Sequence, residues 1–145
     1  MKKNRILITG STGFIGSHLT EICVQNGYNV VAFDRYNPNN HWGWLEESEC
    51  RGEMEIVLGD IRDYDSVSKM IKRSSAVIHM AALIGIPYSY VSPLAYLRTN
   101  VEGTYNVLES SRVYDLDQVV LISTSETYGS AQYIPIDEAH PSVGQ

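Results

Sequence analysis

"ILITGSTGFIGSHL", residues 6–19, joins a short apolar run to a helical pattern through a loop that contains three glycines. The run Ile6–Thr9 predicts a buried strand. Residues 13–26 predict a helix, because apolar side chains recur there at helical spacing, and Gly27 is placed to end it. The stretch therefore predicts a strand, a glycine-rich loop and a helix in direct succession.

The loop has the spacing GxxGxxG rather than the commoner GxGxxG. In a doubly wound sheet this position binds the pyrophosphate of a dinucleotide, and the first amides of the helix hold its negative charge. One glycine permits the tight turn, the second a close approach of phosphate, and the third close packing of the helix. A plain strand–helix turn is the alternative interpretation. The predicted contacts are Gly10, Thr12, Gly13, Phe14, Ile15 and Gly16.

Strands and helices alternate through the rest of the chain. Further strands are predicted at Val30–Phe33, Glu55–Leu58, Ala76–His79 and Gln118–Ile122, with helices after Asp63 and over Leu94–Arg112. Residues 37–51 are polar and irregular, and residues 131–145 read as a loop because of their prolines and glycine. This order predicts an α/β fold, a Rossmann-type doubly wound parallel sheet truncated after about five strands.

Composition narrows the class of partner. The 145 residues carry a formal net charge of -6, which argues against binding to nucleic acid or to an anionic membrane surface. No stretch is long enough to span a bilayer, and the apolar run near the N-terminus is too short for a signal peptide. Cys23 and Cys50 have no metal-site spacing and are expected to be free thiols. We expect one cytoplasmic domain over residues 1–145, with no metal site.

Acidic residues end the second and third predicted strands. Asp34 lies close to the expected offset for a carboxylate that binds the adenosine ribose, where it would also repel a 2′-phosphate and favour NAD over NADP. Arg35 beside it weakens that preference, and a solvated loop acid is the alternative. Asp60 is placed to accept from the adenine amino group while Ile61 packs on the ring, although "GD" alone is more typical of a turn.

The fourth strand ends in "HMAA", residues 79–82. Small residues there, Ala81 and Ala82, would let the backbone pass close to a cofactor. His79 is interpreted as a packed strand histidine rather than a catalyst. His18, His41 and His140 show no partner pattern and are interpreted as structural or exposed.

"STSETYG", residues 123–129, follows the fifth strand and supports two interpretations. Ser123 and Glu126 have capping-box spacing, which would satisfy free amides at a helix start. The alternative is an active site at the carboxyl edge of the sheet. The absence of an apolar helical stripe after Glu126, with Gly129 and Pro135 close behind, favours the second.

"TGSTGFIGSHL", Asp34, "GDIRD", "HMAA", "TNVEGTYNVLE" and "STSETYG" occur in this order, and together they resemble the extended short-chain dehydrogenase/reductase family. The resemblance covers essentially the whole chain and is to the NAD-dependent nucleotide-sugar epimerases and dehydratases. It implies a Rossmann fold, bound NAD, a nucleotide-sugar substrate and a homodimer built on the long helix. It also adds Leu83, Thr99 and Ser123 to the expected cofactor contacts.

Within that family, "Thr-Ser-Glu" at residues 124–126 is similar to the 4,6-dehydratases, and to UDP-glucuronate decarboxylases, whereas simple 4-epimerases usually carry serine at position 124 and no acid at 126. Loop sequences are most similar to dehydratases of UDP- or GDP-N-acetylglucosamine. The resemblance implies that Glu126 removes the C5 proton. It further implies that Ser125 helps to protonate the departing 6-hydroxyl and that Thr124 hydrogen-bonds the 4-oxygen.

The family's catalytic Tyr-x-x-x-Lys pair does not occur in the 145 residues. The chain is therefore expected to be inactive alone, as an NAD-binding part without the catalytic helix or a substrate domain. A sugar 4-epimerase and a UDP-glucuronate decarboxylase stay open as alternatives within the family. From another class, a non-catalytic NAD-binding sensor module stays open, and the missing pair is its best support.

Overall fold

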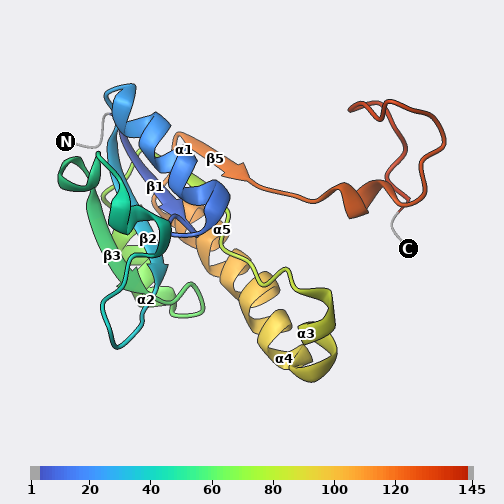
Figure 1. The fold of residues 1–145 in the computed structure, drawn as a ribbon, viewed down its shortest axis with the longest axis horizontal. Helices are drawn as coiled ribbons and strands as arrows, with labels where there is room; N and C mark the ends of the chain where they lie inside the picture. Colours follow the sequence, from blue (N-terminus) through green and yellow to red (C-terminus); the bar gives the residue numbers. More distant parts are fainter. Residues whose placement is uncertain (1–3, 144–145) are drawn as a thin grey trace.

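The computed structural model describes residues 4–143 as one parallel sheet with helices on both faces (Figure 1). The strand order is β3-β2-β1-β4-β5, and every pairing is parallel. The strands are β1 Arg5–Thr9, β2 Asn29–Arg35, β3 Glu55–Gly59, β4 Ala76–His79 and β5 Gln118–Leu121. Each lies within two residues of its predicted bounds, so the predicted doubly wound sheet is confirmed.

Helices connect the strands. They are α1 Phe14–Gln25, α2 Tyr64–Ile71, α3 Ile86–Val91, α4 Pro93–Tyr96 and α5 Gly103–Val113, with short helices η1 Gly43–Glu47, η2 Arg51–Glu53, η3 Leu97–Glu102 and η4 Ser125–Tyr128. Asp63 caps α2 as predicted, since its side chain accepts from the amide of Asp65. Gly27 follows α1 with φ +80°, which fits its predicted role in ending the helix.

Several helical features differ from the sequence prediction. The helix expected over residues 94–112 exists, but its middle, η3, is π-helical. The segment expected to be irregular between β2 and β3 contains η1 and η2, and α3 forms where no helix was predicted. Short helices of this kind depend on packing against neighbouring segments, which periodicity in the sequence does not reveal.

Alternate residues of the central strands face opposite sides of the sheet and build two apolar clusters. Leu7, Phe33 and Val77 pack with α2 and α5 on one face. Ile8 and Val30 pack with α1 on the other. Because both faces are covered, these strands are apolar along their whole length, as buried parallel strands usually are.

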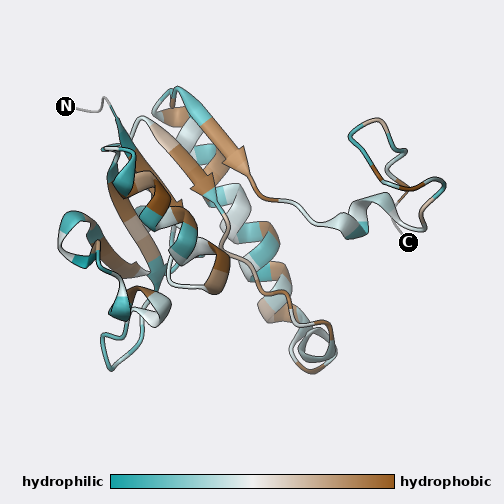
Figure 2. Ribbon diagram, turned by 45° about the horizontal axis from the view of Figure 1, so that its top comes forward, coloured by the Kyte–Doolittle hydropathy of each residue, from teal (hydrophilic) through white to brown (hydrophobic). Residues whose placement is uncertain are grey.

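The fifth strand and the segment after it are more exposed. All four residues of β5 are exposed, and the chain then runs away from the sheet to a lobe of residues 125–143 (Figure 1). Colouring by hydropathy shows that β5 is as apolar as strands in the middle of the sheet (Figure 2). The lobe is held by its own contacts, in which the ring of His140 lies against Tyr128 and Tyr133. Residues 144 and 145 of the predicted tail lie outside the described range.

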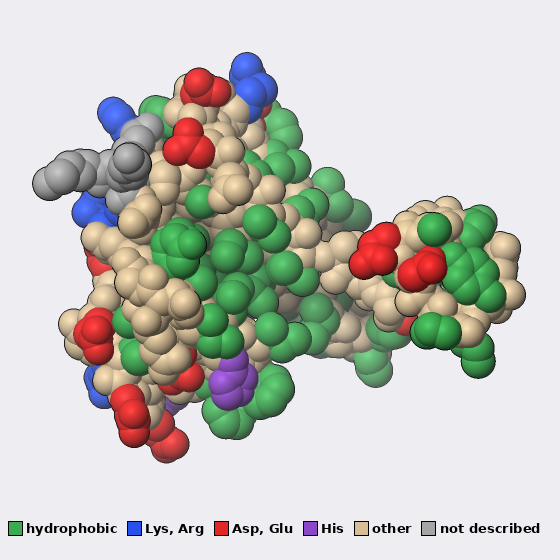
Figure 3. Space-filling view, turned by 90° about the horizontal axis from the view of Figure 1, so that it is seen from above, with side chains coloured by type: hydrophobic (Ala, Val, Ile, Leu, Met, Phe, Trp, Pro, Cys, Tyr) green, Lys and Arg blue, Asp and Glu red, His purple; other side chains and the backbone are tan. Residues whose placement is uncertain are grey.

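Apolar side chains gather over the middle of one face of the molecule (Figure 3). Many of the large apolar residues that are at least two-fifths exposed lie on α1, on the run α3–α5 and on β5. They include Phe14, Ile15, Ile22, Leu97, Val101, Tyr105, Val120 and Leu121.

Candidate functional site

The glycine-rich turn is packed tightly between α1 and the end of β4. Gly10 has φ +73°, and its amide donates to the carbonyl of Phe33. A Cβ at Gly10 would lie 2.8 Å from the amide nitrogen of Ala81, and a Cβ at Gly16 would lie 2.0 Å from the carbonyl oxygen of Gly10. Both contacts are closer than any side chain allows, so the turn requires glycine at these two positions.

The start of α1 is open on its outer side. Gly13 is the N-cap residue, and only the carbonyl oxygen of Gly10, at 3.4 Å, would limit a Cβ there. The amides of the first helical turn have no partner within the helix, and they carry the positive end of its dipole. Phe14 and Ile15, in that turn, are 62% and 68% exposed. Of the predicted phosphate-binding residues, Gly13, Phe14 and Ile15 are therefore exposed at the start of the helix, whereas Gly16 is buried.

Asp34 reaches the same turn from the end of β2. Its Oδ2 accepts from the amide of Thr12 at 2.8 Å and from the Thr12 hydroxyl at 2.7 Å. Its Oδ1 accepts from the amide of Arg35 at 2.6 Å. The half-buried carboxylate is thus held against the glycine-rich turn, and Oδ1 keeps one lone pair that can accept from a ligand's hydroxyl. Arg35 is exposed beside it.

The segment between β2 and β3 also contacts the turn, which sequence reasoning missed. The amide of Trp44 donates to the carbonyl of Thr12 at 3.1 Å, and the Trp44 ring meets Phe14 edge-on at 5.6 Å. Gly43, with φ +54°, lies so close that a Cβ would come within 2.4 Å of the Thr12 carbonyl oxygen. A glycine between two tryptophans was the available signal, because such a residue often marks a close approach of two backbones.

The predicted adenine contacts at the end of β3 occupy different environments. Arg62 binds the Asp60 carboxylate through its side chain and its backbone amide, and this holds the pKa of Asp60 below its ordinary value. Ile61 is only 7% exposed and packs in the core against Gly103. Asp60 thus lies at the carboxyl edge of the sheet with its carboxylate paired to Arg62, whereas most of the Ile61 side chain belongs to the core.

The backbone after β4 is held from two sides. The Thr9 hydroxyl oxygen accepts from the amides of Met80 and Ala81, both at 3.2 Å. The Asn100 side chain accepts from the amide of Leu83 at 2.8 Å and donates to the carbonyl of the same residue at 2.9 Å. This double clamp was not predicted from the sequence. Ala82 lies between the two clamps, and Thr99 precedes Asn100 on η3.

His79 is a packed strand histidine, as predicted. It is 3% exposed, and its two ring nitrogens meet the Thr9 hydroxyl at 2.7 Å and the Thr104 hydroxyl at 3.0 Å. Burial lowers the pKa of His79 to about 4, so the ring is neutral at physiological pH. The other histidines fit their interpretation as structural or exposed, since His140 is buried in the C-terminal lobe and His18 and His41 are exposed.

Residues Ser123, Thr124, Ser125 and Glu126 are all exposed in the segment that leaves β5. The Thr124 hydroxyl accepts from the amide of Glu126 at 3.3 Å and caps the short helix η4. A cap therefore exists, but it uses Thr124 instead of Ser123, on a single 3₁₀ turn that the sequence did not predict. The hydrogen bonds of Thr124 are made within this turn, and the catalytic roles assigned to these residues stay predictions.

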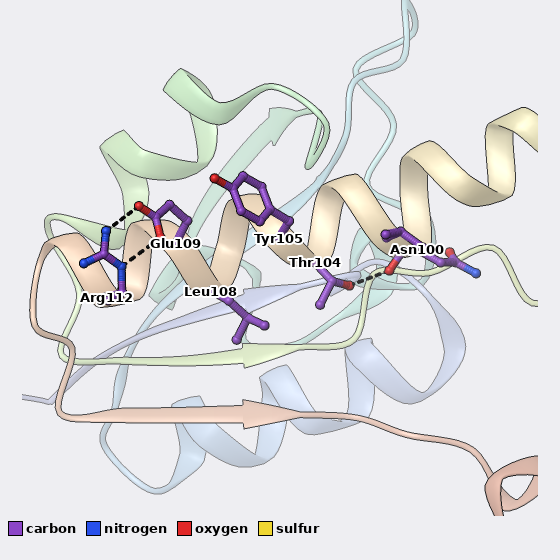
Figure 4. A pocket seen from close by; sticks show the side chains of 7 residues that line it. Asn100, Thr104, Tyr105, Leu108, Glu109 and Arg112 are labelled. Carbon is purple, nitrogen blue, oxygen red and sulfur yellow. Dashed lines mark hydrogen bonds and ion pairs between the residues drawn. The ribbon is translucent and has the colours of Figure 1, made fainter.

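A shallow groove runs along the exposed side of η3 and α5 (Figure 4). Its lining residues are Asn100, Val101, Thr104, Tyr105, Leu108, Glu109 and Arg112. Within residues 4–143 no cluster of histidine, cysteine or acidic side chains has the geometry of a metal site. In the same range no helix is long and apolar enough to cross a membrane.

Comparison with known proteins places this geometry in a family. The model of the family described as GDP-mannose 4,6 dehydratase matches residues 7–145. A putative UDP-glucose 4-epimerase of Methanocaldococcus jannaschii is 38% identical over 94% of the chain, and the human UDP-glucose 4-epimerase is 36% identical over 97%. The chain spans 43% of the length of each of these relatives.

Solved structures agree with the sequence relatives. A UDP-glucose 4-epimerase from Stenotrophomonas maltophila, with bound NAD and formylated UDP-arabinopyranose, superimposes with a TM-score of 0.84 at 28% identity. The match covers 96% of this chain and 42% of that one. MoeE5 in complex with UDP-glucose and NAD is 34% identical with a TM-score of 0.72, over 88% of this chain and 39% of its own. The chain belongs to the extended short-chain dehydrogenase/reductases, in the family of NAD-dependent epimerases and dehydratases that the GDP-mannose 4,6 dehydratase model describes.

Proposed function

We propose that this chain is the NAD-binding part of a nucleotide-sugar-modifying enzyme. The observation that carries the proposal is the hydrogen bonding of Asp34 to Thr12, which joins a ribose-binding carboxylate to the glycine-rich turn at the start of α1. Structures similar to this one contain NAD together with UDP or UDP-sugars. The family and the local geometry therefore support the same class of ligand.

The residues present fit a dinucleotide. The open side of Gly13 and the first amides of α1 would take the diphosphate, and Asp34 would accept from the ribose hydroxyls. Asp60 would accept from the adenine amino group, with Ile61 behind it. The remaining predicted contacts are Ala81, Ala82, Leu83, Thr99 and Ser123. Bound NAD would supply a hydride acceptor, and the protein groups would orient it and exclude water.

Cofactor titration by calorimetry tests this proposal. We expect NAD to bind more tightly than NADP, because the Asp34 carboxylate would repel a 2′-phosphate. Asp34→Asn should weaken NAD binding by roughly tenfold or more, the value of a hydrogen bond to a charged group. Asp65→Asn, at an exposed acid on α2, is the matched control and should leave affinity unchanged. Equal affinity for both cofactors, or an unaffected Asp34→Asn variant, would contradict the assignment.

For the reaction itself, we propose a 4,6-dehydratase acting on a UDP- or GDP-N-acetylglucosamine. Thr124, Ser125 and Glu126 support it, since a carboxylate after β5 is suited to remove a proton next to a ketone. The matched family model also carries a dehydratase description. A 4-epimerase is supported equally by the names of the relatives, and a UDP-glucuronate decarboxylase shares the Thr-Ser-Glu sequence.

Glu126→Gln separates these reactions in a polypeptide that continues this sequence as the relatives do. For a dehydratase, water loss and exchange of the C5 proton with solvent deuterium should fall together, by roughly a hundredfold or more, because the amide cannot take a proton. Epimerisation at C4 should be insensitive to the change. Exchange at the wild-type rate would exclude Glu126 as the base.

The 145-residue chain offers a simpler assay against the non-catalytic alternative. It contains no Tyr-x-x-x-Lys pair, which favours an NAD-binding module without turnover of its own. We expect no 4-keto sugar when the chain is incubated with NAD and UDP- or GDP-sugars. Product above a protein-free control would reveal a general base among these residues.

We also propose that the exposed apolar side of η3 and α5 pairs two copies of the protein. Leu97 and Val101 on η3 and Tyr105 on α5 are each about three-fifths exposed, which is unusual for large apolar side chains that recur at helical spacing. Light scattering at high protein concentration measures this directly, and a stable monomer would contradict it.

A further inference from the structure

The hydroxyl of Thr9 has a defined direction of hydrogen bonding. The amide of Ala81 donates to its oxygen at 3.2 Å, and the amide of Met80 is shared between that oxygen and the backbone carbonyl oxygen of Thr9, also at 3.2 Å. Its single proton is then available for the third neighbour, Nδ1 of His79 at 2.7 Å. A hydroxyl has one donor and two acceptor positions, so all three are used. In this arrangement Nδ1 of His79 is the acceptor and carries no proton.

The same argument fixes the other side of the ring. A neutral imidazole with an unprotonated Nδ1 carries its proton on Nε2, which faces the Thr104 hydroxyl at 3.0 Å. Thr104 in turn donates to the carbonyl of Asn100 at 2.8 Å, the contact drawn in Figure 4. The bonds thus form one directed chain, from the backbone after β4, through β1 and His79, to η3.

Both ends of this chain hold the same backbone segment. Thr9 holds the amides of Met80 and Ala81, and Asn100, at the far end, holds the amide and the carbonyl of Leu83. The segment lies directly on Gly10, whose Cβ position is 2.8 Å from the Ala81 nitrogen. A π-helical turn at η3 is where Asn100 sits, and such turns are frequent at functional sites.

We propose that neutral His79, as its Nε2–H tautomer, is a positioning residue that sets residues 80–83 against the glycine-rich turn and thereby shapes the cofactor site. Histidine suits this role because its acceptor and its donor lie on opposite sides of one rigid ring, so it can bridge β1 and α5. Asparagine and glutamine carry both groups at one end. The effect on the cofactor rests on the proposed NAD binding, whereas the tautomer and the backbone clamp do not.

Three variants of the 145-residue chain test the proposal. Thr104→Val keeps the side-chain shape but removes the acceptor for Nε2–H, and Thr104→Ser restores it. Thr20→Val is the matched control, because Thr20 is fully buried on α1 and its hydroxyl has no hydrogen-bond partner among the described residues. For each protein we would record the ring ¹⁵N spectrum of His79, amide exchange at Ala81 and Leu83, and the affinity for NAD.

In the wild type we expect an unprotonated Nδ1 and slow exchange at both amides. Thr104→Val should speed this exchange and weaken NAD binding by roughly tenfold, the value of one hydrogen bond, with recovery in Thr104→Ser and no change in Thr20→Val.

A protonated Nδ1 would overturn the proposal, as would equal exchange in Thr104→Val and wild type. An effect of Thr20→Val as large as that of Thr104→Val would do the same, since it would show a general loss of packing. If no protein binds NAD, the proposed function fails, and the ring spectrum and amide exchange still decide the role of His79.

Discussion

The first and fifth strands have similar apolar sequences and opposite environments. In β1, "RILIT", the residues from Ile6 to Thr9 are at most 8% exposed. In β5, "QVVL", Val119, Val120 and Leu121 are 39–49% exposed. Both strands pair with β4, but β1 also pairs with β2 and has helices over both faces. An apolar run therefore indicates a strand, whereas its burial depends on neighbours that the run does not specify.

The polar segments that follow these two strands differ in the same way. After β1, Thr12 is bonded to Asp34 from β2 and to Trp44 from η1, and Gly10 rests on the end of β4. After β5, Thr124 bonds only within its own short turn. The glycine-rich turn is thus positioned by several elements of the fold, and residues 123–126 by their local sequence.

Two glycine substitutions provide the strongest test of this contrast. A Cβ at Gly16 would lie 2.0 Å from the carbonyl oxygen of Gly10, and a Cβ at Gly129 would lie 2.3 Å from that of Val143. We expect Gly16→Ala to lower the free energy of unfolding by about 3 kcal/mol or more, because neither backbone can move away. Gly129→Ala should change the unfolding of the sheet by less than about 0.5 kcal/mol, since its clash lies within the lobe of residues 125–143.

Urea unfolding followed by circular dichroism measures both effects. Gly52→Ala serves as the control, because nothing lies within 4 Å of a Cβ at that position. If Gly129→Ala destabilised the sheet as much as Gly16→Ala, the lobe and the sheet would unfold as one unit and the contrast would be wrong.

The buried ring of His79 predicts a pH dependence for the sheet. Burial depresses its pKa from 6.5 to about 4 in the folded protein. Between these values the unfolded chain binds the proton and the folded chain does not, so stability is lost as pH falls from 6.5 to 4. The shift corresponds to about 3 kcal/mol.

His79→Asn removes this titration. Its absolute stability should be lower than that of the wild type, but its free energy of unfolding should fall less steeply between pH 6.5 and 4. Carboxyl groups that titrate in the same range are common to both proteins, so the difference between the two slopes isolates His79. Equal slopes would mean that the ring is protonated inside the fold.

The sequence predicted the sheet well because each strand is a local apolar pattern. It also predicted that Asp34 lies near the glycine-rich turn, because one strand–helix–strand unit sets their separation. Contacts between segments far apart in sequence were not predictable in this way. The docking of Gly43 and Trp44 on Thr12, and the clamp of Asn100 on Leu83, depend on how loops and a π-helical turn pack. The interpretation of residues 123–126 was limited by the same cause, since η4 is a single turn without a periodic pattern.

The smallest expected effects come from two matched threonine substitutions, one after each strand. The Thr12 hydroxyl donates to the Asp34 carboxylate at 2.7 Å in a half-buried position. Thr12→Val keeps the β-branched shape and removes that bond, and the Thr12 amide still holds Asp34, so we expect a loss of about 1 to 1.5 kcal/mol. Thr124 is exposed, and its hydroxyl accepts from the Glu126 amide at 3.3 Å, a bond that water can replace. Thr124→Val should therefore change stability by less than about 0.5 kcal/mol.

Thermal unfolding of the two variants, measured in parallel with the wild type, gives the loss of stability for each substitution. A loss in Thr124→Val that matched the loss in Thr12→Val would mean that residues 123–126 pack on the sheet in solution, and the two segments would then be equally integrated into the fold.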